Sequence, residues 1–195
     1  MPPTSNVGLD QCLTVLRRQG LLLQSDPKLP SVTTIVAGES IRGSWWGHRA
    51  ARLIYQTLQL LGEHPDVLLV KLVAGKDTLV HRRLWPQIYA IGIAGEAWQR
   101  TGLSRAARRL ERDLNQAGQL QATGAAAKEL QSRLLAHGGQ FHTAAGSHAM
   151  QLESWIHWAQ RLGLKMERIP PHEARTKIEE ALPTAKFPWC SKLVP

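Results

Sequence analysis

Apolar residues recur every three or four positions over several stretches of the chain. This spacing, with a glycine after each stretch, predicts helices over residues 9–19, 31–37 and 44–61. The second stretch also permits a strand, because it contains Val, Thr and Ile. The third is the clearest helix, since Ser44 is a candidate N-cap and Gly62 follows its end.

The predicted helix over 44–61 places neighbouring aromatic residues on different faces. Trp46 falls on the apolar face, which indicates a core position, whereas Trp45 falls outside that face. His48 falls in the first helical turn, also away from the apolar face. The sequence therefore predicts that Trp45 and His48 lie at an open surface.

The pattern then changes from helical to extended. Residues 67–73 are almost continuously apolar, and a glycine-containing turn sequence separates them from residues 78–82, which predicts a β-hairpin. Within this hairpin, Lys71 and His81 are expected to approach one site. A second long helix is predicted over residues 85–100, because proline is tolerated in the first turn of a helix.

The second half of the chain has a different order of elements. From residue 103 onward the pattern predicts a helix, a short strand, a helix, a turn at 138–139, a short strand or wing at 140–143 and a long helix over 147–162. This is the order of a winged helix-turn-helix module. A short helix near 171–182 and a loose tail complete the chain.

Together these elements predict an α+β fold, mainly helical, with a small antiparallel hairpin or sheet and a winged-helix-like C-terminal part. Residues 1–102 form a helical region whose hairpin carries the candidate site. Residues 103–165 form the winged-helix-like region, and residues 166–195 form a short helix and tail. We expect all three to belong to one compact unit.

Composition adds a charge argument. The 195 residues include 24 Lys and Arg against 15 Asp and Glu, a formal net charge of +9, which favours polyanionic partners. No apolar run approaches the roughly 18 residues of a membrane span, and no secretory signal is visible. We therefore expect a cytoplasmic protein whose partner is DNA, with no membrane partner and no obligate protein partner. The histidines of the second half lack zinc-ligand spacing, so neither metal nor cofactor is expected.

The glycine-, serine- and tryptophan-rich segment around Ser44 is the strongest candidate for binding. The unpaired N–H groups at a helix start attract anions, and the nearby Arg42, Arg49 and Arg52 add positive charge, so a phosphate of nucleic acid would fit there. The face of Trp45 could stack a base. The alternative is that Ser44 is an ordinary cap and the arginines form a solvated face.

Four residues could carry chemistry. Glu39 could orient a water or stabilise an oxocarbenium ion, or could form a salt bridge to Arg42. His48 could accept a proton or read a base, or could be a surface histidine without a role. Lys71 lies in an apolar strand, where desolvation lowers a lysine's pKa and favours Schiff-base chemistry, unless it snorkels at a sheet edge. His81 closes the second strand.

Further basic and aromatic residues could contact the nucleic acid. Arg82 and Arg83 could hold phosphates, and Trp85 could stack or wedge between bases. Arg105 and Arg108 give the helix after residue 102 a basic face that could dock on the phosphate backbone, although such faces are usually only solvated.

Several strings of the sequence resemble a family of small bacterial proteins. They are Leu-Pro-Ser-Val at 29–32, Gly-Ser-Trp-Trp-Gly-His at 43–48, His-Pro-Asp-Val-Leu at 64–68, Val-His-Arg-Arg-Leu-Trp-Pro at 80–86, Phe-His-Thr at 141–143, Gly-Ser-His at 146–148 and Leu-Glu-Ser-Trp at 152–155. The family is associated with DNA glycosylases of repair or anti-phage defence. The resemblance implies a helical fold with a small sheet and a winged-helix-like part, and a site that includes His48, Lys71 and His81.

The leading hypothesis is a DNA-binding enzyme that flips a modified base and cleaves its N-glycosidic bond. Glu39 would manage the water or the developing charge, and His48 and His81 would read or protonate the leaving base. Lys71 would attack the sugar and add a lyase step. The alternatives are a non-catalytic winged-helix regulator of DNA and an RNA-binding or RNA-processing module.

Overall fold

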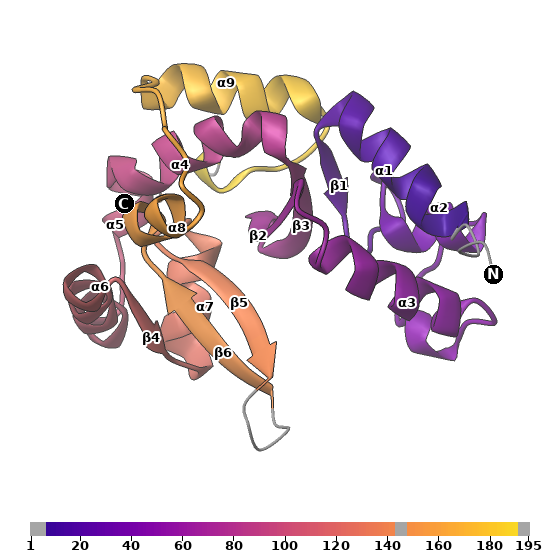
Figure 1. The fold of residues 1–195 in the computed structure, drawn as a ribbon, viewed down its shortest axis with the longest axis horizontal. Coiled ribbons are helices and arrows are strands. Elements are labelled where there is room, and N and C mark those ends of the chain that lie inside the picture. Colours follow the sequence, from indigo (N-terminus) through magenta and orange to yellow (C-terminus); the bar gives the residue numbers. More distant parts are fainter. Residues whose placement is uncertain (1–6, 143–147, 191–195) are drawn as a thin grey trace.

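The N-terminal part of the protein is helical and is arranged around a small sheet. The structure is a computed structural model and describes residues 7–142 and 148–190. Its first elements in chain order are α1 (Val7–Gln19), β1 (Leu21–Leu23), α2 (Val32–Ala37), the 3₁₀ helix η1 (Trp45–Gly47) and α3 (Ala51–Gly62) (Figure 1). Ser31 caps α2 by accepting a hydrogen bond from the Thr34 N–H, and Gly38 ends the helix in the left-handed conformation, in agreement with the glycine expected after this stretch.

The predicted hairpin is confirmed and forms most of the first sheet. Strands β2 (Val67–Val73) and β3 (Lys76–His81) pair antiparallel, and β1 adds a third strand in the order β1-β3-β2. Ala74 and Gly75 form the tight turn with φ angles of 49° and 71°. Positive φ at both central residues is the geometry that joins two twisted strands with a two-residue loop.

A second three-stranded sheet belongs to the later part of the chain. The 3₁₀ helix η2 (Arg82–Leu84) leads into α4 (Trp85–Ala94), and the elements that follow are α5 (Ala97–Arg100), α6 (Arg105–Ala117), β4 (Gln119–Gln121), α7 (Gly124–Ser132), β5 (His137–His142), β6 (His148–Glu153), α8 (Trp155–Arg161), α9 (Pro171–Ala181) and η3 (Pro188–Cys190). The sheet is antiparallel in the order β4-β6-β5. The predicted α+β, mainly helical fold with small antiparallel sheets is confirmed.

The largest hydrophobic core joins the two halves. It contains residues of the first sheet, α4, α8 and α9. Trp158 packs edge-on against Trp85, with ring centroids 5.5 Å apart, and against Trp155 at 5.4 Å. Figure 1 shows α9 lying along α4 above the hairpin. The segment after α9 belongs to this core as well, because Phe187 is buried and the Ala74 N–H at the hairpin tip donates to the Lys186 carbonyl. The predicted loose tail is wrong for this segment.

Three predicted helices have different boundaries. The helix over 44–61 begins only at Ala51, the helix over 85–100 is interrupted at Gly95, whose φ is 61°, and the helix over 147–162 is replaced by strand β6 followed by α8. Ser154 caps α8, and Ser147 lies outside the described residues.

The winged-helix-like part stays a prediction. Gly138 and Gly139 lie inside β5 and do not form a turn. Between β4 and β5 the chain forms one helix, α7, whereas a helix-turn-helix requires a pair. Within residues 7–142 and 148–190, no helix combines the length and apolarity that crossing a bilayer requires.

Candidate nucleic-acid interface

The two neighbouring tryptophans exchange the positions that the sequence predicts for them. Trp45 is only 7% exposed and packs with Ile41 and Ile54, whereas Trp46 is 63% exposed. The two rings stack at 4.1 Å with an interplanar angle of 23°, and Tyr55 lies 5.8 Å from Trp46. The predictions for both tryptophans are therefore wrong.

The reason is the break before α3. Ser44 accepts a hydrogen bond from the Trp46 N–H and so caps a 3₁₀ turn, not the start of a long α-helix. His48 is extended, with ψ of 148°, and interrupts the helical periodicity. A 3₁₀ helix has 3.0 residues per turn, so the faces assigned on a continuous α-helix over residues 44–61 do not apply to Trp45 and Trp46.

Three exposed arginines stand within seven positions of the exposed aromatic residue Trp46 in the sequence. We call Trp46, Tyr55 and the exposed side chains of Arg42, Arg49 and Arg52 the Trp46 surface. Arg52 and Tyr55 stand three positions apart on α3 and so share one face of that helix. The arrangement offers an aromatic plane for stacking and guanidinium groups for phosphates.

Glu39 and His48 lie together beside this surface. His48 Nε2 is 3.2 Å from a carboxylate oxygen of Glu39, and Arg49 donates to the same oxygen at 3.3 Å. His48 Nδ1 accepts the Ala50 N–H at 3.1 Å, so we assign the ring proton to Nε2, which donates to Glu39. Both ring nitrogens are engaged, and His48 therefore holds Glu39 in position and has no free acceptor. The salt bridge of Glu39 is to Arg49 and not to Arg42.

Lys71 and His81 do not approach one site, and that prediction is wrong. In the hairpin register Lys71 lies opposite Asp77, whereas His81 lies opposite Val67. Four residues along a strand separate the two positions by roughly 13 Å. Lys71 Nζ donates to Asp77 at 2.8 Å on the edge strand β2, which agrees with the alternative of a lysine at a sheet edge. The four candidate catalytic residues thus do not form a single cluster.

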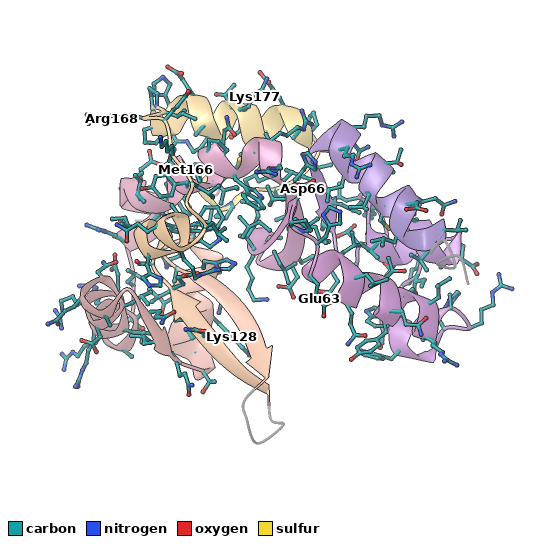
Figure 2. The ribbon with its side chains drawn as sticks, viewed as in Figure 1. Glu63, Asp66, Lys128, Met166, Arg168 and Lys177 are labelled. Atoms are coloured by element: carbon teal, nitrogen blue, oxygen red, sulfur yellow. The ribbon has the colours of Figure 1, made fainter. Side chains whose placement is uncertain are left out.

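The residues around His81 have partners within the protein. Arg82 pairs with Asp66 at 3.0 Å; Figure 2 shows Asp66 near the centre of the molecule, just after α3. Arg83 donates to the Arg18 carbonyl at 3.0 Å. Burial lowers the pKa of His81, and the positive charges of Arg83, Arg17 and Arg82 lower it further against the opposing effect of Asp66.

Trp85 is a core residue, so its predicted stacking or wedging role is wrong. It is 7% exposed, and its indole N–H donates to the Val80 carbonyl at 3.1 Å. Its position at the start of α4 directs the ring into the main core beside Trp158.

The basic face predicted for α6 exists. Arg105 and Arg108 are exposed, as are Arg109 and Arg112 on the same helix. Arg109 lies 3.9 Å from Asp113. Within the described part of the chain, neither Arg108 nor Arg112 has an acidic partner at ion-pair distance. Their charge is therefore available to an anion.

No known protein family, curated protein or solved structure matches the chain. The resemblance to DNA glycosylases stays a prediction that rests on the quoted strings alone.

Sequence reasoning missed a buried ionic cluster around Glu153 at the end of β6. Its carboxylate accepts hydrogen bonds from Arg161 at 2.7 and 2.8 Å and from His157 Nδ1 at 2.7 Å, and His137 Nδ1 lies 3.7 Å away. Burial alone would raise the pKa of Glu153, but the bonds from Arg161 and the histidines outweigh it and hold the pKa well below its usual range. The spacing of four residues from Glu153 to His157 and four more to Arg161 is the sequence signal for this cluster.

Among the residues that the structure describes, no group of three or more His, Cys, Asp and Glu side chains is arranged to hold a metal ion.

Proposed function

We propose that the protein binds nucleic acid, with DNA as its partner, and that unpaired bases stack on Trp46. The observation that carries this proposal is the 63% exposure of Trp46, whose ring is stacked on the buried Trp45, in a segment that also holds exposed arginines. An exposed tryptophan leaves a large apolar area in water, which is unfavourable unless a partner covers it. A base covers such a ring, and the neighbouring Arg42, Arg49 and Arg52 suit the phosphates that accompany it.

Affinity for a fluorescently labelled single-stranded oligodeoxynucleotide, measured by anisotropy, tests this proposal. We expect Trp46→Ala to weaken binding roughly 5- to 150-fold, the equivalent of the ~1–3 kcal/mol typical of one stacked base. The matched control is Leu60→Ala, which removes another exposed apolar side chain from α3 and should leave affinity unchanged. An unchanged affinity in a correctly folded Trp46→Ala protein rules the stacking surface out.

Competition experiments decide between the kinds of nucleic acid. Single-stranded RNA that competes better than DNA of the same sequence would assign the surface to RNA. Tight, sequence-specific binding of duplex DNA that is insensitive to Trp46→Ala would favour the regulator with a winged-helix-like module. A steep decrease of affinity with salt is expected in each case, because phosphate contacts release counterions.

Base excision is the catalytic form of the proposal, and Glu39 is the residue that favours it. Its carboxylate lies at the edge of the Trp46 surface, with one oxygen bonded to His48 and Arg49. The test is incubation with DNA that carries modified cytosines, followed by detection of alkali-labile abasic sites. Glu39→Gln should abolish base release while DNA affinity stays nearly intact. Absence of release at enzyme excess would remove the catalytic part and leave the binding proposal standing.

A further inference from the structure

A cleft lies between the C-terminal end of α4, the second half of α6 and the start of α8. It has a volume of about 410 Å³ and is lined by the amide side chains of Asn115, Gln116 and Gln160, by apolar residues such as Ile93 and Ile156, and by His157. In Figure 1 these helices lie on the opposite side of the molecule from α3. The cleft is thus separate from the Trp46 surface.

The cleft continues into a second, basic hollow. This hollow has a volume of about 540 Å³ and shares Arg100, Glu111 and Asn115 with the first, and it adds Arg108 and Arg112. Arg100 lies 3.4 Å from Glu111, which partly balances its charge. Glu111 also lines this hollow, but in the described ranges no acidic side chain lies within ion-pair distance of Arg108 or Arg112. One end of the combined cleft is therefore rich in amides and apolar groups, and the other is positively charged.

His157 is held in one orientation at the amide-rich end. Its Nδ1 bonds to the ionised, 7%-exposed carboxylate of Glu153, which Arg161 holds through two further hydrogen bonds. We assign the ring proton to Nδ1, which leaves Nε2 as an acceptor in the neutral ring. Within the described residues, Nε2 has no hydrogen-bond partner. Gly118 makes room for the ring, because a Cβ there would lie 2.8 Å from His157 Cδ2.

We propose that this cleft binds a nucleotide, with the heterocycle between the amides and His157 and the phosphate at Arg108 and Arg112. Amide side chains and a fixed imidazole acceptor match the mixed donors and acceptors at the edge of a base. Aliphatic side chains cover its faces, and guanidinium groups bind phosphate in paired hydrogen bonds. The volume lies in the range of pockets for small ligands, about 300–1,000 Å³. The site goes beyond the proposed function, because it shares no residue with the Trp46 surface.

Calorimetric titration of the intact protein with dAMP, dCMP, dGMP and dTMP tests this inference. We expect at least one of them to bind with a stoichiometry of one, and Arg108→Ala and Arg112→Ala each to weaken it about tenfold. The matched control is Arg109→Ala, on the same helix and exposed, but paired with Asp113 and outside the cleft. Equal losses from Arg109→Ala and Arg108→Ala, with thermal stability preserved, would overturn the proposal, and so would the absence of binding for all of these nucleotides.

Two further measurements distinguish the contributions of the heterocycle and the phosphate, and identify the source of the ligand. If inorganic phosphate binds as tightly as the nucleotides, the proposed role of the heterocycle is wrong. His157→Gln should weaken the binding of the nucleotide but not the binding of phosphate. A 5′-phosphorylated oligonucleotide that competes with the bound mononucleotide would identify a strand end as the source, and failure to compete would identify a free nucleotide. Both measurements are repeated with Trp46→Ala, which should leave nucleotide binding unchanged, so that failure of this site and failure of the Trp46 surface are distinguished.

Discussion

Replacing Glu153 by glutamine should destabilise the protein strongly while preserving the size of the side chain. The carboxylate is 7% exposed and accepts three hydrogen bonds of 2.7–2.8 Å from Arg161 and His157. A glutamine amide has one oxygen that can accept from these donors, and its NH₂ group, itself a donor, faces the remaining ones. The variant therefore leaves partly buried donors without an acceptor and a guanidinium without its counter-charge.

The magnitude follows from the surroundings of the two partners. Loss of one member of a buried ion pair costs ~3–5 kcal/mol, and we expect about 3 kcal/mol here, because the Arg161 side chain is 49% exposed and regains contact with water. For a chain of this size, ~1 kcal/mol corresponds to roughly 2–4 °C, so the Tm should fall by roughly 6–12 °C.

Urea unfolding and calorimetry measure the loss, with Glu180→Gln as the matched control. Glu180 pairs with Lys177 at 2.8 Å, but both side chains are more than half exposed, so its loss should change stability by less than about 1 kcal/mol. The pKa of Glu153 is lower in the folded than in the unfolded state. The contribution of Glu153 to the free energy of unfolding is therefore complete above the unfolded pKa of ~4.3 and is lost as the pH falls below that value. Equal Tm values for the two variants at neutral pH would refute the ionic cluster.

Three other outcomes follow from the hairpin and its ends. Ala74→Asn should raise stability by about 0.5 kcal/mol, because asparagine tolerates the positive φ of 49° better than alanine; a decrease in the urea midpoint would contradict this. Lys71→Met should leave nucleic-acid affinity and any base release unchanged, because Lys71 is paired with Asp77 at the sheet edge; loss of base release by this variant would restore its catalytic role. The lowered pKa of His81 means that the unfolded chain takes up the proton first, so stability should decrease as pH falls below ~6.5. Urea unfolding at pH 7.5 and 5.5 should show a smaller loss of stability for His81→Asn than for the natural protein. An identical loss in the two proteins would argue against the lowered pKa of His81.

Elements with both a clear period and a terminal signal could be predicted from the sequence. The hairpin followed from two apolar runs around Gly75, and α6 followed from the helical spacing of apolar residues after residue 103. Strand β1 could not be predicted, because three leucines have no period that distinguishes a strand from the end of a helix. It is defined by its pairing with β3.

The exposure of the candidate segment was predicted but not its detail, and its role as a nucleic-acid site stays a proposal. The arginine- and tryptophan-rich segment is at the surface, as its composition indicates. Which of the two tryptophan rings is exposed depends on whether residues 45–47 form a 3₁₀ turn or an α-helical turn, and the same residues are compatible with both. The Glu153 cluster was missed because residues 148–153 were assigned to a helix, and a strand places Glu153 at its end, where His157 reaches back to it from α8. In both cases the local sequence is compatible with two conformations, and tertiary packing determines which one forms.

The stacking of Trp46 on Trp45 has a consequence for kinetics. Because Trp45 is buried among Ile41 and Ile54, the outer indole is restrained in the free protein, and in the proposed complex it would have little rotational freedom left to lose. Replacing the underlying ring, as in Trp45→Leu, would free the Trp46 ring without removing it. The resulting loss of affinity for nucleic acid would be seen as a faster dissociation rate, with an almost unchanged association rate.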